Sequence, residues 1–258
     1  MRHLFDAPTR TVGLALTLAA VLSASASAQL SSYSQDFESL DRTVGTALSD
    51  DGWLLFASGI NGAPGFDNFG AGPFGAPNDI AGPQVSVISD TLSGDPPAGN
   101  QGLVVFSDYN SGLHQDPNDP RDLVISVFQE QIIDASDIGK SVTFDFLADG
   151  NANPPTGDAI AEAFLITLDP NNDFAATNNL AVNTTTVAEG ALLQGSLSLD
   201  ITDPALVGQI LQFGFRNTAS DFEGSAVDYD NVSFTVIPEP TSLVLLGVGM
   251  LAGVRRRR

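Results

Sequence analysis

Carboxylates are the groups with which this chain is best equipped to do chemistry. It has 31 acidic and 10 basic residues, two histidines and no cysteine. Without cysteine there are no thiolate metal ligands, iron–sulfur clusters or cysteine nucleophiles. A serine–histidine–acid triad would have to recruit His114, the one histidine after residue 28, and the sequence contains no Gly-x-Ser-x-Gly motif. Zinc catalysis normally draws on two or three histidines and is equally disfavoured.

A glycosidase needs only two carboxylates, which lie about 5–10 Å apart. The chain has ample carboxylates for such a pair, but no spacing in the sequence marks a particular two. We therefore expect no enzyme activity. A glycoside hydrolase or lyase is kept as a remote alternative without named residues.

Hard cations are the other ligands that carboxylates bind. Calcium takes about six to eight oxygen ligands, several of them from carboxylates. Asp228 and Asp230 are two residues apart in an extended segment, so both side chains can point to one side of a strand. Asp149-Gly150-Asn151 begins like an EF-hand loop, but Pro154 replaces the required glycine and no glutamate follows at the twelfth position. The sequence therefore favours Asp228 and Asp230 as calcium candidates over the loop.

Sugar recognition typically uses exposed aromatic rings that stack on pyranose rings. The supply is small: Trp53, three tyrosines and the phenylalanines of the glycine-rich segment 59–82. We expect Trp53 and Tyr229 to be structural, which leaves Tyr109 and Phe69 as candidate ligand-binding residues. The phenylalanines of segment 59–82 have a second and favoured interpretation, as apolar plugs that pin a long loop.

Short β-branched and aromatic runs, separated by Gly, Pro, Asn and Asp clusters, must position these side chains. In 142–146 and 211–215 every second residue is apolar, which is typical of a half-buried antiparallel strand, and no stretch has a long helical period. We predict an all-β fold, a two-sheet antiparallel β-sandwich of the jelly-roll type. The predicted strands are Ser34–Phe37, Trp53–Ala57, Val85–Ser89, Leu103–Asp108, Leu123–Glu130, Val142–Ala148, Ala161–Leu168, Leu192–Ile201, Ile210–Asn217 and Ala226–Val236.

The first 28 residues have the composition of a secretory signal peptide. Two arginines precede the apolar run 12–22, and small residues follow up to Ala28. The run is too short to cross a bilayer, which takes about 20 residues in a helix. We expect cleavage between Ala28 and Gln29, with a buried amphipathic helix as the alternative.

Residues 29–237 form the predicted domain, and its charge is strongly negative. All but two of the 31 acidic residues lie in it. Its basic residues are Arg42, Arg121, Lys140 and Arg216. Such a surface repels phosphate backbones and anionic lipid headgroups, so we expect no nucleic acid partner. Solubility, divalent cation binding and a salty medium are three interpretations of the excess charge.

The tail 238–258 has three parts. Pro238-Glu239-Pro240 ends the preceding strand because proline lacks the amide N–H that a strand or helix needs. Leu243–Val254 is apolar and would be about 18 Å long as a helix, short for a full membrane span. Arg255–Arg258 would stay cytoplasmic. We expect a short hydrophobic helix that enters the inner membrane transiently.

This order of parts resembles the PEP-CTERM sorting signal. The resemblance implies recognition by an exosortase, a membrane enzyme of Gram-negative bacteria that produce exopolysaccharide. The matching positions are Pro238, Glu239, Pro240, Arg255, Arg256, Arg257 and Arg258. It also implies export across the inner membrane to the cell surface or extracellular matrix, with exopolysaccharide as a potential partner. The alternative is an ordinary C-terminal anchor that is never cut.

Short motifs spread over the domain resemble jelly-roll carbohydrate-binding modules. They are Gln35–Glu38 followed by Gly52-Trp53, the stretch 127–144, and Val227–Phe234. The resemblance implies that the first and last strands lie side by side, and that acidic residues from both hold a structural calcium ion. Carried over, the ligands would be Asp36 or Glu38 with Asp230, and Asp228 as an optional addition.

Two functions besides the remote enzyme remain open. A structural protein of an exopolysaccharide-associated envelope requires only a stable, acidic, exported sandwich, and it is the function that we expect. A calcium-stabilised carbohydrate-binding module is the alternative. The small supply of aromatic side chains argues against tight sugar binding.

Overall fold

The computed structural model describes residues 29–60, 68–80, 85–90, 98–107, 121–220 and 224–238. These residues contain strands β1 Tyr33–Gln35, β2 Leu54–Ile60, β3 Phe69–Gly75, β4 Ser86–Ser89, β5 Gly102–Ser107, β6 Asp122–Ile132, β7 Lys140–Gly150, β8 Ala161–Asp169, β9 Ala175–Asn183, β10 Leu193–Ile201, β11 Ile210–Ala219 and β12 Ser225–Ile237. The helical elements described are α1 Ala47–Asp50 and two 3₁₀ turns, Ala135–Asp137 and Pro204–Leu206.

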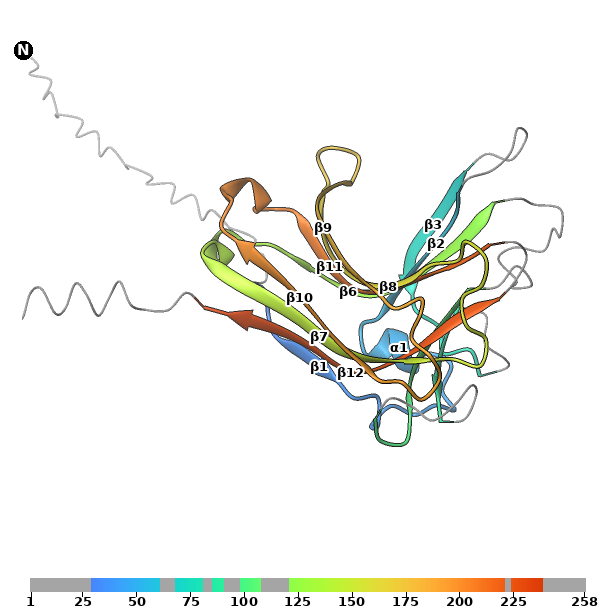
Figure 1. Cartoon of the computed structure of the whole chain (residues 1–258). Coiled ribbons are helices and arrows are strands. Elements are labelled where there is room, and N and C mark those ends of the chain that lie inside the picture. The colour runs from blue at the N-terminus through green and yellow to red at the C-terminus, as the bar shows by residue number, and fades with distance from the viewer. Residues whose placement is uncertain are drawn as a thin grey trace, which may run out of the picture.

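The strands form two six-stranded antiparallel sheets. One has the order β10-β7-β12-β5-β4, with β1 also paired to β12, and the other has the order β3-β2-β6-β11-β8-β9. Figure 1 shows them as two layers, with β1, β7 and β12 in one and β6, β8 and β11 in the other. Tyr33 of β1 lies opposite Phe234 of β12, so the first and last strands are neighbours as expected. The predicted two-sheet antiparallel β-sandwich is confirmed.

Strand β3 corrects the prediction that segment 59–82 is a loop. Its sequence, FGAGPFG, is rich in residues that weaken strands, and Pro73 suits only an edge. The strand forms because its glycines accept a neighbouring ring: a Cβ added at Gly70 would lie 2.9 Å from the ring of Phe56. Packing against β2 therefore overrides the local propensity of this edge strand.

Strand β9 is the second strand that the sequence did not reveal. It reads AATNNLAVN and pairs with β8 at the edge of its sheet. Alanine and asparagine have low strand propensity, so the segment resembles a polar connection. Its weak signal is the alternation of Leu180 and Val182, which pack half-buried against the core.

Aromatic rings from both sheets fill the core. Phe215 of β11 stacks on Tyr229 of β12 with ring centroids 3.7 Å apart, and Phe213 stacks on Phe234 at 4.2 Å. Trp53 lies fully buried beside them, with its ring 6.3 Å from that of Phe215. Trp53 and Tyr229 are therefore structural residues, as the sequence predicted.

A buried asparagine ties the two sheets together. Asn217 of β11 donates from Nδ2 to the carbonyl of Val105 in β5, at 3.0 Å, and to the carbonyl of Ser225 in β12, at 2.8 Å. Its Oδ1 accepts a hydrogen bond from the Ser225 hydroxyl. Val105, Asn217 and Ser225 are all fully buried, so water cannot replace the side chain of Asn217 in these hydrogen bonds.

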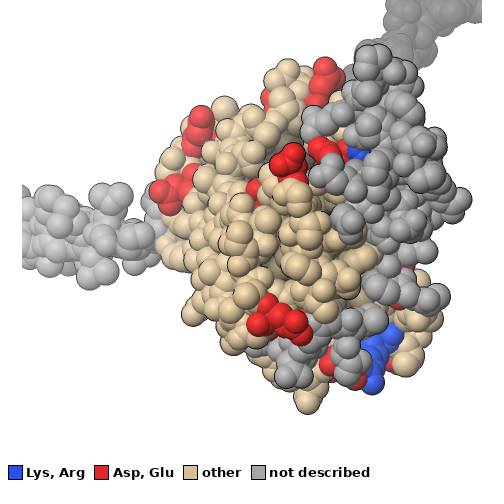
Figure 2. All heavy atoms as spheres, turned by 45° about the vertical axis from the view of Figure 1, so that its right-hand side comes forward, with Lys and Arg blue, Asp and Glu red and all other residues tan. Residues whose placement is uncertain are grey.

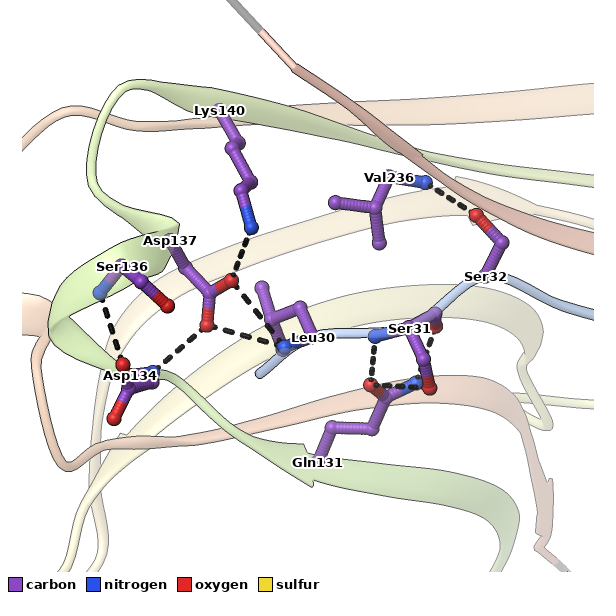
Figure 3. A network of polar contacts seen from close by, with 9 residues as sticks. All are labelled: Leu30, Ser31, Ser32, Gln131, Asp134, Ser136, Asp137, Lys140 and Val236. Carbon is purple, nitrogen blue, oxygen red and sulfur yellow. Dashed lines mark hydrogen bonds and ion pairs between the residues drawn. The ribbon is translucent and has the colours of Figure 1, made fainter. Parts of the chain in front are cut away.

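The N-terminal segment of the described chain is bound at the end of the sandwich where the last strand finishes. The backbone N–H of Leu30 donates to the buried carboxylate of Asp137, which also accepts from Lys140 Nζ at 2.8 Å (Figure 3). Two residues on, the Ser32 hydroxyl accepts from the backbone N–H of Val236 at 3.0 Å. Residues directly after the predicted cleavage point thus belong to the fold.

The bridge between the sheets gives a first test. We expect Asn217→Ala to lower the free energy of unfolding by about 2–4 kcal/mol, because it removes three hydrogen bonds between fully buried groups of the two sheets. Asn179→Ala on the exposed face of β9 is the matched control and should stay within about 0.5 kcal/mol of wild type. Urea denaturation measures both, and equal losses in the two variants would contradict the assignment.

Candidate functional site

Three of the four predicted calcium ligands lie together where β1 ends beside β12. Asp36 and Glu38 follow β1 in a turn made possible by Phe37, which has a positive φ of 57°. Asp230 lies in β12 directly before a bulge that includes Asn231, with φ 48°. The charges of Glu38 and Asp36 act on the carboxyl of Asp230, so the turn and the bulge bring the three carboxylates into one electrostatic group.

Backbone N–H groups already occupy these carboxylates. Glu38 Oε1 accepts from the amides of Asn100, at 2.5 Å, and Gln101, at 3.1 Å. Asp230 Oδ2 accepts from the amide of Ala98 at 2.9 Å, and its Oδ1 accepts from the amide of the following residue at 2.6 Å. These donors supply the partial positive charge that a bound cation would otherwise supply.

The pKa values in this group shift in opposite directions. Burial raises the pKa of Asp230 to about 6; hydrogen bonds from two backbone amides oppose the shift, and the charges of Glu38 and Asp36 add to it. The pKa of the exposed Glu38 carboxyl is lowered, chiefly by the backbone amides of Asn100 and Gln101. One acid of the group is thus able to take up a proton in mildly acidic medium while its neighbour stays ionised.

Calcium at these residues stays a prediction. Among the described residues there is no group of three or more His, Cys, Asp or Glu side chains placed to hold a metal ion. The carboxylates of Glu38 and Asp230 accept hydrogen bonds from backbone amides. Asp36 likewise turns its Oδ1 toward the backbone N–H of Glu38, at 3.2 Å.

The fourth predicted ligand, Asp228, belongs to a different group. It lies in β12 opposite Asp149 of β7, and its Oδ1 accepts from Asn151 Nδ2 at 2.7 Å. All three side chains are almost completely buried. Asp149 and Asn151 were considered only as part of an EF-hand-like loop, and strand pairing instead gives them a place beside Asp228. The sequence signal for this group was the start of that loop motif.

A polar hollow of 430 Å³ adjoins the first group at the junction of β1 and β12. Its lining residues are Ser34, Gln35, Asp36, Ser39, Asn231, Val232 and Ser233. Hydroxyl, amide and carboxylate groups of this kind can form hydrogen bonds with sugar hydroxyls. No aromatic ring is among these lining residues, so the hollow lacks the stacking surface common in sugar sites.

The candidate aromatic ligands have different outcomes. Tyr109 lies outside the described residues, as does His114. Phe69 packs half-buried against the core, and the guanidinium of Arg121 lies 4.9 Å from its ring centroid. Phe74 in the same strand is 57% exposed, so the interpretation of the phenylalanines as buried plugs is wrong for this residue. Sugar stacking on Tyr109 or Phe69 stays a prediction.

Basic side chains of the domain lie against carboxylates or an aromatic ring. Arg42 pairs with Asp90, Lys140 with Asp137 and Arg216 with Glu162, and Arg121 lies over Phe69. Figure 2 shows carboxylates scattered over one face, with few basic side chains between them. The described residues in that view form no concentrated basic patch.

Both processing segments fall mostly outside the described residues. Residues 1–28 are not described, and of the tail only Pro238 is, as an exposed residue after β12. The predicted cleavage at Ala28, the apolar run 243–254 and the arginine cluster 255–258 are therefore not placed. The described residues include no helix of the length and apolar character required to cross a membrane.

Comparison with known proteins identifies the tail. Residues 236–258 match the model of the PEP-CTERM protein-sorting motif, so the predicted sorting signal is confirmed as a sequence motif. No curated protein sequence matches the chain.

Three solved structures share the general fold at low similarity. The Stig cyclase Fisc from Fischerella sp. TAU has 14% identity and TM-score 0.45, with 81% of this chain and 100% of the cyclase covered. The CBM22-1 xylan-binding domain of Paenibacillus barcinonensis Xyn10C has 11% identity and TM-score 0.39, with 81% and 95% covered. The enzymatically active domain of bacteriophage CBA120 tailspike protein 4 has 13% identity and TM-score 0.41 over 77% of this chain and 21% of the tailspike. Likenesses of this size say nothing about activity.

The raised pKa of Asp230 predicts a pH dependence of stability. Between about pH 4 and pH 6 the folded chain keeps a proton on Asp230 that the unfolded chain releases, since a free aspartate has a pKa near 3.9. The stabilisation linked to this proton is complete below about pH 4 and is lost as the pH rises through about 6. Relative to Asp230→Asn, wild type should lose up to about 3 kcal/mol of unfolding free energy across that range.

Asp173→Asn is the control for this titration, because Asp173 is exposed and its positive φ of 51° suits asparagine equally well. Its profile should run parallel to that of wild type in urea denaturation at each pH. A wild-type profile parallel to that of Asp230→Asn would contradict the raised pKa.

Proposed function

We propose that this chain is an exported protein of the cell surface or extracellular matrix, processed by an exosortase, in which the acidic sandwich has a structural and non-catalytic role. The observation that carries the proposal is the junction of domain and tail. The sorting motif begins at Val236, and Val236 and Ile237 are still paired with β7, opposite Val142 and Ser141. The folded domain and the sorting signal are therefore joined without a flexible linker.

Strand β12, which leads from the domain into the sorting motif, has paired neighbours on both sides. Strand β12 pairs with β7 along one side and with β5 and β1 along the other. A tail attached to such a strand holds the whole sandwich close to the point of anchoring. This arrangement suits a protein that is displayed at a surface and that carries load through its C-terminus.

The charge distribution supports a place in a hydrated matrix. The domain has few basic residues, and Arg42, Lys140 and Arg216 are in ion pairs. The remaining acidic excess keeps such a domain soluble and repels other anionic surfaces. Acidic polymers and this domain would therefore associate through shared cations rather than by direct ion pairs.

Carbohydrate binding is the second candidate function, and the polar hollow beside β1 and β12 favours it. The hollow presents hydroxyl and amide groups from Ser34 of β1, from Asn231 of β12 and from Ser39 in the turn after β1. Groups held on strands are positioned more firmly than groups on loops, which helps them to select among sugar hydroxyls. Calcium would here be a stabilising ion held near Asp36, Glu38 and Asp230, as the resemblance to carbohydrate-binding modules implies.

The mature mass and cellular fraction of the protein test the first proposal. In the native host we expect a product that begins at Gln29, lacks the arginine cluster 255–258 and accumulates with cells or matrix. Replacing Pro238, Glu239 and Pro240 by alanine should leave the tail uncut and hold the protein at the inner membrane. An untrimmed, full-length chain in the cytosol would falsify the proposal.

A glycan array tests the second candidate with residues 29–237. Binding in the hollow should be lost with Asn231→Gly, which removes the side chain while allowing the positive φ, and retained with Tyr109→Ala. Loss with Tyr109→Ala alone would place the ligand elsewhere. Silence across neutral and acidic polysaccharides would refute carbohydrate binding and leave the structural role.

A further inference from the structure

The outer face of one sheet carries an ordered array of hydroxyl groups. Along β1, β12, β7 and β10 alternate side chains enter the core, among them Phe144, Leu197 and Phe234, and the residues between them point outward. The outward residues with a hydroxyl are Ser34, Thr143, Ser196, Ser198, Ser233 and Thr235. Each of them is exposed or half-buried, so the array is open to solvent.

The register of the strands arranges these side chains in rows. Ser34 of β1 lies opposite Ser233 of β12, which in turn lies opposite Asp145 of β7. Asp145 lies opposite Ser196 of β10, so the first row crosses four strands. Neighbouring strands are about 4.8 Å apart, and the first row therefore presents a polar group at about that interval. The second row consists of Thr235, Thr143 and Ser198.

The fold leaves hydrogen-bonding capacity unused in the first row. Within the described part of the chain, the side chains of Ser34, Asp145 and Ser196 form no hydrogen bond or ion pair. On the outer face of the other sheet, by contrast, Arg216 pairs with Glu162. The groups of the first row are therefore available to a partner from outside the chain.

The first row ends in the polar hollow. Ser34 and Ser233 belong both to the row and to the lining of the hollow. From there the row continues across β12 and β7 to the edge strand β10. Figure 1 shows these strands side by side in the lower layer of the sandwich. Hollow and row thus form one continuous polar surface.

The chemistry of this surface selects an uncharged partner that is rich in hydroxyl groups. A serine or threonine hydroxyl both donates and accepts a hydrogen bond, as a sugar hydroxyl does. The charged residue of the first row is Asp145, and the domain around it is strongly acidic, so anionic polymers are repelled. A protein partner would use aromatic, methionine or arginine side chains as anchors, and neither row contains one.

We propose that this surface binds an extended neutral polysaccharide, with one part of the bound chain in the hollow and the next sugars along the first row. The proposal rests on carbohydrate binding in the hollow, the second candidate function, and adds to it the class of polymer and the direction in which the chain continues. One sugar of an extended chain is about as long as the spacing of two strands, so the row accommodates about three or four sugars. Asp145 accepts hydrogen bonds from sugar hydroxyls at the centre of the row, and Ser196 binds the sugar at its far end.

Isothermal titration of the mature protein with neutral gluco-, manno- and galacto-oligosaccharides of increasing length tests the surface. Each added sugar exchanges hydrogen bonds with water for hydrogen bonds with the row, so affinity should rise in modest steps. For the sugar type that binds, we expect a gain of about tenfold from the disaccharide to the tetrasaccharide. Alginate, a polyanion, should bind more weakly than the neutral tetrasaccharide.

Variants separate the row from the hollow. Asp145→Ala combined with Ser196→Ala should remove the gain of about tenfold for the tetrasaccharide and leave the disaccharide affinity unchanged, which also shows that the fold is intact. The matched control is Ser126→Ala combined with Glu130→Ala, which removes the same kinds of group from β6 in the other sheet and should change neither affinity.

Two results overturn the proposal and leave sugar binding in the hollow standing. One is an affinity that stops rising at the disaccharide, and the other is a tetrasaccharide affinity that the Asp145 and Ser196 variant lowers no more than the control does. Failure of every neutral oligosaccharide to bind the wild-type protein removes the hollow and the row together.

Discussion

Strand β12 is hydrogen-bonded to β7 on one side and to β1 and β5 on the other, and this double pairing fixes which of its side chains enter the core. Tyr229 and Phe234 both enter the core although they are five residues apart, an odd spacing that would place them on opposite faces of a regular strand. The bulge after Asp230, with Asn231 at positive φ, supplies the extra residue that brings them to the same face. Asp230, on the other face of β12 from Tyr229, is buried and interacts with Glu38 and Asp36 of the turn after β1.

Backbone amides, and not only basic side chains, donate hydrogen bonds to carboxylates in this domain. Asp137 accepts from the amides of Leu30 and Asp134, and Glu38 and Asp230 accept from amides of the turn that leads into β5. Charge-assisted hydrogen bonds of this kind stabilise the ionised form without a cation. A domain with four basic residues can thus fold around a large acidic excess.

The sequence predicted the fold wherever alternation coincided with burial. Strands β7 and β11 were evident because every second residue is apolar and faces the opposite sheet. Strands β3 and β9 were missed because edge strands with one partner tolerate glycine, proline and asparagine.

Among the candidate site residues, Asp36, Glu38 and Asp230 were grouped through the expected pairing of first and last strands. Asp149 was not grouped with Asp228, because their proximity depends on the register between β7 and β12, which are far apart in the sequence. Such a register is set by packing across the sandwich, and no local pattern expresses it.

The ends of the domain show how processing and folding can be independent. Leu30 and Ser32 are tied to Asp137 and Val236, while Gln29 and Pro238 on either side of the paired region are exposed. Removal of the segments beyond these two residues would break no hydrogen bond described within the sandwich. The hydrogen bonds that hold both ends of the described domain are therefore compatible with removal of the predicted signal segment and tail. A sorting signal can therefore follow a central strand directly, because β12 ends at Ile237, before Pro238-Glu239-Pro240 begins.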